Sequence, residues 1–424
     1  MLRRLPAIML GAALLVIAFS TGADFLFFIL YLGLLVIGGS YVVTRFGLAD
    51  LEAGYVLDRL HGHVGEVLQA TYTVRNVGRL PKLWLEVHNA CTLPVPLPGR
   101  ALALGPRSER AWARRVPLVA RGHFRVDPLL IRTGDPFGFF EASATVGGTA
   151  GIIVYPRVEA LPRWRLPASS LEGSSAAPER TLQATPSVAS IRPYAPGDAY
   201  NRIHWKSSAR QQGLQVKEFE LEQTADLWIF LDLDRRVQAG EGEESTLEAG
   251  VRVAAALCSH AVLENRAVGI IAAGHRMAML PADRGARQHQ KVMALLAAVG
   301  ADGSTPLVET LLAGLPRVRR GMTVVIVTPS LERGWLQPLS ALRTRGVASV
   351  VCLLDRAAFD AHGRRTRGLA AQPLALLADQ DRVARAMGNA LAEFDVPVYP
   401  ILPGRKLGEL LVGVGAGRQL GVRP

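Results

Sequence analysis

The first fifty residues constrain this chain most, because they hold two apolar stretches separated by a short polar turn. The stretches run from Pro6 to Ser20 and from Phe25 to Val43, and Thr21–Asp24 lies between them. A helix needs about 20 apolar residues to cross a hydrocarbon layer of about 30 Å, so the second stretch is long enough and the first is near the lower limit. The pattern predicts a transmembrane helical hairpin over residues 1–50.

Positive charges at both ends of the hairpin predict its orientation. Arg3 and Arg4 precede the first stretch and Arg45 follows the second, whereas the turn carries Asp24. Basic flanks stay in the cytoplasm, so we expect a two-pass protein of the plasma (inner) membrane with most of the chain cytoplasmic. A signal peptide is the alternative, but Ser20 lacks a small-x-small cleavage pattern and a second apolar stretch follows at once.

Composition limits the remaining part of the chain without deciding its function. A length of 424 residues exceeds one ordinary domain. The net charge of +12 suits both an anionic membrane surface and nucleic acid, so charge alone does not choose between them. Cys91, Cys258 and Cys352 are widely separated in apolar sequence, which predicts buried free thiols and no disulfide framework.

Residues 51–160 change to an alternating pattern that is typical of short β-strands. Val67–Val74, Leu83–Val87 and Gly151–Tyr155 place β-branched and aromatic residues on one face, and Gly, Pro and Asn separate such runs. Strands at this spacing predict a small β-sandwich of the immunoglobulin-like kind.

The segment from Asp135 to Phe140 reads as a turn followed by a strand end. Its aromatic residues, Phe137, Phe139 and Phe140, are expected to plug the sandwich core. A ligand site is the alternative for this segment.

The C-terminal part alternates between apolar strands and amphipathic helices after a linker. Residues 161–190 are rich in Pro, Ser, Ala and Arg, which is linker composition, and residues 191–424 form the last predicted domain. Alternation of this kind predicts an α/β fold with a mainly parallel sheet, because parallel strands need helical crossovers. The predicted strands are Leu227–Leu231, Val268–Ile271, Met322–Val327 and Val347–Leu354, and the predicted helices are Ser245–Asn265, Gln288–Ala298, Trp335–Arg345 and Arg382–Glu393.

A dense group of basic, aromatic and turn-forming residues between Ile191 and Glu220 is the main candidate site. It predicts partner binding by Arg192, Tyr194, Gly197, Asp198, Arg202, His204, Trp205, Lys206 and Arg210.

A turn at the start of this group is expected to lead into a helix from about Ala199 to Gln212. Arg202, Lys206 and Arg210 are four residues apart and would share one helix face as a basic ridge. The alternative is an ordinary solvated face. Trp205 is predicted to be a core residue, with an interface contact as the alternative.

These motifs resemble the domain-of-unknown-function-58 family, whose members are usually membrane-anchored. The resemblance rests on Arg192-x-Tyr194-x-x-Gly197-Asp198-x-x-x-Arg202-x-His204-Trp205-Lys206-x-Ser208-Ala209-Arg210 and on Leu214-x-Val216-Lys217-Glu218. Upstream segments also match, namely Arg121-Gly122-x-Phe124, Asp135–Phe140 and Val154–Arg157. No biochemical activity is implied by the family.

The resemblance implies a von Willebrand factor A-like domain, whose adhesion-type members hold a divalent cation in an Asp-x-Ser-x-Ser loop after the first strand. In this chain Asp232 begins that loop, but Asp234 and Arg236 replace the two serines. An arginine would oppose a cation, and Mg²⁺ needs near-octahedral oxygen ligands. No metal or cofactor is therefore predicted. Asp232 and Asp234 are the only candidate Mg²⁺ ligands, and otherwise they cap the loop or pair with Arg235 and Arg236.

Signatures of enzymes are scarce in this sequence. It contains no GxxxxGK[ST] phosphate loop, no HExxH zinc motif and no GxSxG nucleophile elbow. Asp198 and His204 could form an acid-base pair, but no nucleophile lies beside them. The chain is therefore expected not to be an enzyme.

The sequence thus predicts a membrane-anchored protein-interaction adaptor for a cell-envelope or complex-assembly process. The family resemblance implies a MoxR-type AAA+ ATPase as partner, and also a transglutaminase-like membrane protein. The bilayer is the other expected partner, and nucleic acid is not expected. The alternatives are nucleic-acid binding by the basic ridge and an envelope hydrolase.

Overall fold

The computed structural model describes residues 5–164, 188–195, 200, 203–210, 213–219, 226–369 and 374–412. The chain divides into two compact units. One is Met1–Arg157 with Leu296–Ala298, and the other is Val158–Leu295 with Val299–Pro424.

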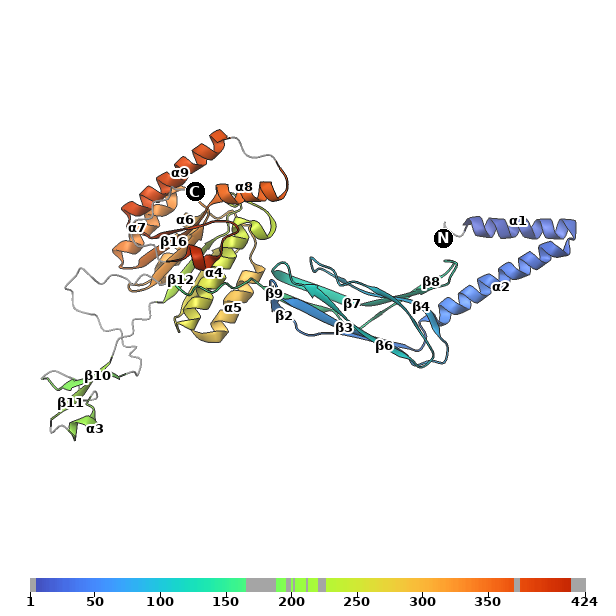
Figure 1. The fold of residues 1–424 in the computed structure, drawn as a ribbon, viewed down its shortest axis with the longest axis horizontal. Helices are drawn as coiled ribbons and strands as arrows, with labels where there is room; N and C mark the ends of the chain where they lie inside the picture. Colours follow the sequence, from blue (N-terminus) through green and yellow to red (C-terminus); the bar gives the residue numbers. More distant parts are fainter. Residues whose placement is uncertain are drawn as a thin grey trace. The chain divides into compact units, whose positions relative to one another are not determined.

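The first unit begins with two apolar helices, α1 (Leu5–Thr21) and α2 (Asp24–Gly47), at the positions that the sequence predicts. Gly22 has a φ of 66°, a conformation that glycine adopts easily, and it permits the tight turn between them (Figure 1). The 24-residue α2 is long and apolar enough to cross a membrane, and only 6% of the residues in its most apolar 18-residue segment are buried. Helix α4 (Thr246–Leu263) is also long and apolar enough, but 61% of its residues are buried, which identifies it as a core helix.

A β-sandwich follows the helices, as predicted. One sheet has the order β1-β3-β6, and the other has the order β2-β9-β7-β4-β5 with β8 paired to β7. The strands are β1 (Leu51–Leu57), β2 (His61–His63), β3 (Val67–Asn76), β4 (Lys82–Cys91), β5 (Arg100–Leu104), β6 (Glu109–Pro117), β7 (Gly122–Gly134), β8 (Glu141–Val146) and β9 (Ala150–Tyr155). Alternate residues of both sheets, such as Leu68 of β3 and Ile131 of β7, share one buried core.

The aromatic residues after β7 do not plug this core as predicted. Phe137 is 62% exposed, and its ring stacks on Phe139 with centroids 6.0 Å apart. The physical reason is the turn itself. The Asp135 carboxylate accepts hydrogen bonds from the backbone N–H of Phe137 at 3.0 Å and of Phe140 at 2.6 Å, so the chain turns away from the core.

The second unit contains a six-stranded sheet with the order β14-β13-β12-β15-β16-β17. Five strands are parallel and only β14 is antiparallel. The strands are β12 (Leu227–Asp232), β13 (Val268–Ala273), β14 (Met277–Asp283), β15 (Thr323–Thr328), β16 (Ala348–Leu354) and β17 (Val398–Ile401). Every residue of β12, β13 and β15 is buried, which is typical of parallel strands covered on both faces.

Helices cover both faces of this sheet (Figure 1). Helices α6, α7 and α9 pack on the face that includes Phe230, whereas Gly250 of α4 lies close to Leu231 on the opposite face. The helical segments are α4, α5 (Gly285–Ala298), α6 (Leu307–Gly314), α7 (Leu336–Thr344), α8 (Arg356–Thr366), α9 (Leu374–Glu393) and α10 (Leu407–Leu410), with 3-10 turns η3 (Gly242–Glu244), η4 (Leu315–Arg317) and η5 (Arg333–Trp335).

Both edge strands of the sheet contain a proline. Pro281 lies in β14 and Pro400 lies in β17. Proline has no backbone N–H to offer, and within sheets it is confined to positions of this kind.

The start of the second unit extends into the predicted linker. Leu161 and Trp164 are buried, and the Trp164 ring meets His260 edge-on with centroids 5.5 Å apart. Glu159 accepts a hydrogen bond from the backbone N–H of Leu407. The part of the predicted linker at 161–164 is therefore packed against the domain, and residues 165–187 lie outside the described residues.

Candidate functional site

The predicted partner-binding residues lie in a small hairpin, which we name the signature hairpin. It consists of β10 (Val188–Pro193), the short helix α3 (Trp205–Ser208) and β11 (Gln215–Phe219). Strands β10 and β11 are antiparallel, and among the described residues they form a two-stranded sheet of their own. Gly197, Asp198 and Arg202 lie outside the described residues.

The helix predicted from Ala199 to Gln212 is wrong in its extent, because α3 has only four residues. Ile203 forms a β-bridge with Val216, so the chain is still extended one residue before His204. Arg210 lies in the turn after α3 and not on the helix. The basic ridge on one long helix therefore does not form.

Hydrogen bonds within the signature hairpin position α3. The Nδ1 atom of His204 accepts the backbone N–H of Ser207 at 3.1 Å and lies 2.7 Å from the Ser207 hydroxyl, so His204 caps the helix. The Ser208 hydroxyl donates to the His204 carbonyl and accepts the backbone N–H of Gln215. These bonds tie the helix to β11.

Large side chains of the signature hairpin project into solvent. Trp205 is 67% exposed and Tyr200 is 72% exposed, so the prediction that Trp205 is a core residue is wrong. The helix is too short to cover an indole, and the neighbouring strand already packs against Ile203. The Tyr194 ring stacks on Tyr200 with centroids 6.0 Å apart. Lys206 and Arg210 are also exposed.

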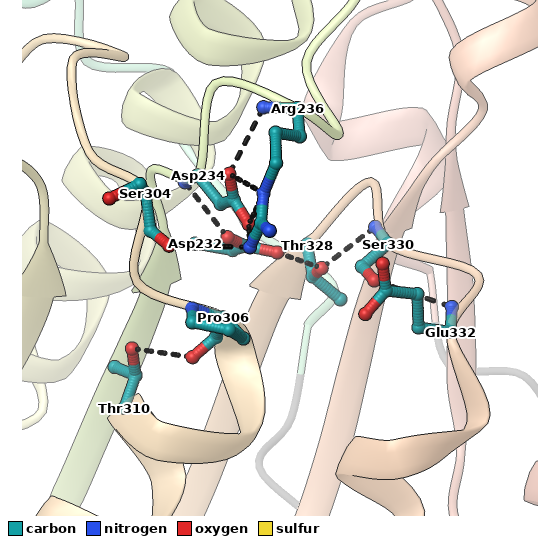
Figure 2. A network of polar contacts seen from close by, with 9 residues as sticks. All are labelled: Asp232, Asp234, Arg236, Ser304, Pro306, Thr310, Thr328, Ser330 and Glu332. Carbon is teal, nitrogen blue, oxygen red and sulfur yellow. Dashed lines mark hydrogen bonds and ion pairs between the residues drawn. The ribbon is translucent and has the colours of Figure 1, made fainter.

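A second polar cluster lies where β12 and β15 end side by side. In an open sheet, ligands bind at such a point, because the crossovers on its two sides run in opposite directions. Asp232 ends β12 and Asp234 lies just beyond it, and these residues are 4% and 3% exposed. Thr328 ends β15 and Ser330 lies just beyond it, and they are 0% and 3% exposed. Figure 2 shows these side chains together.

Asp232 is held by donors from both strand ends. The Thr328 hydroxyl donates to Asp232 Oδ2 at 2.6 Å, and the backbone N–H of Asp234 donates to Oδ1 at 3.1 Å. Thr328 Oγ1 in turn accepts the backbone N–H of Ser330. Burial raises the pKa of Asp232 to about 6, although both donors favour the ionised form.

Asp234 carries a counter-ion from its own loop. The Arg236 guanidinium contacts both carboxylate oxygens, with Nη2 2.6 Å from Oδ2 and Nε 3.0 Å from Oδ1, and Nη2 also donates to the Ser304 carbonyl (Figure 2). Burial raises the pKa of Asp234, but these hydrogen bonds and the positive charge outweigh that effect and the net pKa is lowered. The predicted pairing with Arg236 is therefore confirmed.

This donor set does not fit the divalent cation that the family resemblance implies. Arg236 already takes both oxygens of Asp234, so that carboxylate is not available to a cation beside Asp232. Among the described residues, no three His, Cys, Asp or Glu side chains group closely enough to hold a metal ion. A cation at this position would also meet the guanidinium charge.

Comparison with known proteins assigns one segment of the chain to a family. Residues 190–359 match the model described as "Protein of unknown function DUF58", a span that runs from the signature hairpin to α8. The chain carries a DUF58 segment.

Relatives of this protein are themselves uncharacterized. It is 27% identical over 317 residues to the uncharacterized protein YeaD of Bacillus subtilis, which covers 71% of this chain and 74% of that protein. It is 28% identical over 170 residues to the uncharacterized protein Rv1480 of Mycobacterium tuberculosis, covering 39% of this chain and 53% of that relative. The chain thus spans about half the length of the mycobacterial relative.

Solved structures add no inference about the fold. The CARDB domain of the PF1109 protein from Pyrococcus furiosus is 14% identical and covers 25% of this chain and 92% of that domain, with a TM-score of 0.19.

Two features of the DUF58 segment escaped the sequence analysis. The sequence pattern does not single out Tyr200, which lies between β10 and α3 and is 72% exposed. Ser208 belongs to the motif without a predicted role of its own, yet its hydroxyl joins α3 to β11 by accepting the backbone N–H of Gln215. The signal was available in the sequence, since serine near a histidine cap often bonds to the backbone.

Proposed function

We propose that this protein is a membrane-anchored adaptor without catalytic activity, which binds a partner protein through the signature hairpin. The partner class that the family resemblance suggests is a MoxR-type AAA+ ATPase, with a transglutaminase-like membrane protein as a second candidate. The process would be one of the cell envelope or of complex assembly.

The exposure of Trp205 carries this proposal. An exposed indole offers a large apolar area to a partner, and tryptophan and arginine are enriched among residues that dominate binding energy. Ile191 and Leu214 are each 42% exposed in the same hairpin, so Trp205 and Tyr200 are not isolated apolar groups. Several exposed apolar side chains on one small hairpin favour a docking role.

The charges beside Trp205 favour a partner with an acidic surface. Lys206 and Arg210 are exposed, and no salt bridge joins either of them to an acid within the described residues. A partner's carboxylates would therefore meet available cations around an apolar centre, an arrangement that gives specificity and speeds association.

Helices α1 and α2 support membrane anchoring in this proposal. Leu34 and Leu35 in the middle of α2 are each 71% exposed, which is unfavourable in water and suitable in lipid. The basic flanks Arg3, Arg4 and Arg45 favour a two-pass arrangement in the plasma membrane with the α/β unit in the cytoplasm.

The order of the six-stranded sheet supports a von Willebrand factor A-like assignment for the α/β unit. Five parallel strands with one antiparallel edge strand, and a polar cluster at the β12/β15 strand ends, are the features in its favour. The Arg236–Asp234 ion pair supports binding without a metal ion in this domain.

The test is nucleotide-dependent capture of the MoxR-type ATPase of the same organism by the full chain in nanodiscs. We expect capture by the wild type with ATP, and loss of capture in Trp205→Ala and in Lys206→Glu/Arg210→Glu. Removal of a central tryptophan costs about 2 kcal/mol or more in typical interfaces, which is roughly a 30-fold weaker Kd.

Matched controls come from exposed positions outside the signature hairpin. Leu263→Ala removes a side chain that is 86% exposed on α4, and Arg287→Glu/Lys291→Glu reverses two exposed charges that are also four residues apart, on α5. Both controls should keep capture. Absence of capture by the wild type in every nucleotide state would overturn the adaptor proposal. Binding of duplex DNA with a steep salt dependence, lost in the hairpin charge reversal, would favour nucleic-acid binding.

A further inference from the structure

The last two turns of α2 are fixed to the β-sandwich. Ser40, Thr44 and Gly47 are buried, whereas most of α2 before them is exposed. A Cβ atom on Gly47 would lie 2.7 Å from Thr133 Cγ2, so the helix end approaches β7 as closely as glycine allows. The Tyr41 ring of α2 also meets Phe140 edge-on at 5.6 Å.

A buried lysine closes the joint between α2 and β4. Lys82 is 3% exposed and its Nζ donates to the Phe46 carbonyl at 2.7 Å, a carbonyl at the helix end that also accepts the backbone N–H of Ala49 at 3.3 Å. Burial lowers the pKa of Lys82, and the charge of Asp50 acts in the opposite direction. These contacts fix the sandwich to the end of α2, so the depth of α2 in a membrane also determines the distance of the sandwich from that membrane.

The sandwich end that contacts α2 carries exposed apolar side chains. We name these four residues the apolar fringe: Leu80 is 55% exposed, Leu83 60%, Trp84 44% and Phe137 62%. Leu80 follows β3, Leu83 and Trp84 begin β4, and Phe137 follows β7. The start of β4 and the end of β7 contact α2, through Lys82 and Thr133.

Hydrogen bonds hold the loops of the apolar fringe in place. The Asn76 side-chain amide donates to the carbonyls of Leu80 and Gly105, both at 2.8 Å, and its oxygen accepts the backbone N–H of Gly78. The Asp135 carboxylate holds the Phe137 turn in the same manner. The exposure of the fringe is thus a property of ordered loops.

The length of α2 determines how deep in the bilayer its contact with the sandwich lies. At 1.5 Å per residue, the 20 residues from Asp24 to Val43 span about 30 Å, which is the thickness of the hydrocarbon layer. Asp24 is charged and belongs outside that layer, so the opposite boundary falls near Tyr41 to Val43. The Phe140 ring contacts Tyr41, which places the loop before β8 at the same depth.

We propose that the apolar fringe inserts into the interfacial region of the bilayer at the point where α2 leaves it. The occupant of this surface is therefore lipid, because the surface is continuous with the membrane-spanning helix. Tryptophan favours this depth, and the exposed Arg45 and Arg79 meet lipid phosphates there. The inference rests on the proposed membrane anchoring of α2.

The experiment uses added tryptophans as depth reporters in the full chain. Nanodiscs of phosphatidylethanolamine and phosphatidylglycerol are made with and without lipids brominated near the glycerol end of the acyl chain, or at mid-chain. The six native tryptophans, including Trp84 of the fringe, emit in every variant, so the signal of each added tryptophan is the difference from the wild type. Leu34→Trp then reports on α2. Phe137→Trp reports on the fringe. Val67→Trp, 48% exposed at the other end of β3 and about 30 Å away along the strand, is the matched control.

The expected result is loss of the added Phe137→Trp emission with the shallow brominated lipid, loss of the Leu34→Trp emission with the mid-chain lipid, and no loss for Val67→Trp. Quenching of Leu34→Trp without quenching of Phe137→Trp would overturn the fringe proposal and leave the anchor intact. No quenching of Leu34→Trp would overturn both. Equal quenching of Val67→Trp and Phe137→Trp would overturn specific insertion of the fringe. Unchanged circular dichroism confirms that each variant is folded.

Discussion

The Thr328 hydroxyl donates a 2.6 Å hydrogen bond to the carboxylate of Asp232, which lies 96 positions earlier in the chain. The bond joins the ends of β12 and β15, where the order of the sheet changes direction. It also places a hydroxyl against Asp232, which forms no ion pair with a basic side chain among the described residues, unlike Asp234 with its Arg236 counter-ion. The stability of the α/β unit at these two strand ends therefore depends on the Thr328 hydroxyl.

Thr328→Val should destabilise the α/β unit by about 1–3 kcal/mol, because Asp232 and the Ser330 N–H both lose a partner inside the protein. The free energy of unfolding in urea, followed by the buried tryptophans, measures the effect. Thr323→Val is the matched control on the same strand. The Thr323 hydroxyl is buried and has no hydrogen-bond partner among the described residues, so its removal should be neutral or stabilising. Equal losses in the two variants would contradict the role of the bond.

The pH dependence of stability should carry a contribution from Asp232. Its pKa in the folded protein is about 6, above the ordinary value of 3.8, so the folded state binds this proton more tightly than the unfolded state. The contribution is fully present below pH 4 and is lost as the pH rises through about 6. Two pKa units correspond to about 3 kcal/mol.

Asp232→Asn should remove this contribution. Free energies of unfolding at several pH values between 4 and 7.5 should decrease more steeply for the wild type than for Asp232→Asn. Parallel curves would mean that the folded protein ionises Asp232 at its ordinary pKa.

Arg236→Ala should destabilise the protein at neutral pH and less so in acid. The pKa of Asp234 is lowered in the folded state, so the stability it contributes is present above pH 4 and is lost as the pH falls through the folded pKa. Without Arg236, a buried carboxylate remains without its counter-ion. Thermal unfolding at pH 7 and at pH 3.5 measures the difference. Arg235→Ala, an exposed neighbour, should change Tm little at either pH.

His204→Ala should loosen the start of α3 by about 1 kcal/mol, since the cap to the Ser207 N–H is lost. Amide hydrogen exchange at Ser207 should accelerate accordingly. His204→Asn can supply a side-chain oxygen at the same position and should restore much of the protection. Unchanged exchange at Ser207 in His204→Ala would show that the cap does not order the helix.

Gly303→Ala should disturb the loop beside the β12 strand end. A Cβ atom there would lie 2.7 Å from the Gly274 carbonyl, and backbone cannot move aside as a side chain can. The Arg235 N–H bond to the Gly303 carbonyl would be strained as a result. We expect a loss of about 1–3 kcal/mol in unfolding experiments. Gly334→Ala meets nothing within 4 Å and is the control.

Local patterns were sufficient to predict most of the α/β unit. Runs such as Leu227–Leu231 are apolar at every position, which suits a strand covered on both faces, and α4 lies within the predicted helix Ser245–Asn265. The antiparallel strand β14 was missed because Pro281 interrupts a mixed sequence. Its position at the sheet edge is what makes that proline acceptable.

The candidate sites were harder to predict because long-range pairing decides them. The Arg236–Asp234 pair lies within one loop and could be expected from the sequence, whereas the Thr328–Asp232 bond needs the strand order. Trp205 is expected in the core from its residue type, because tryptophan is more often buried than exposed. The pairing of β10 with β11 leaves only a four-residue helix there, and no adjacent layer of the hairpin covers the indole.

The prolines in β14 and β17 restrict how other chains can attach to this domain. An added strand would need a continuous row of N–H groups from the edge, and Pro281 and Pro400 each interrupt that row. Extension of the sheet by a peptide, or edge-to-edge stacking of two copies into a filament, is thereby disfavoured. A partner is left with side chains and loops to recognise, so the choice of partner depends on residues that can change without altering the sheet.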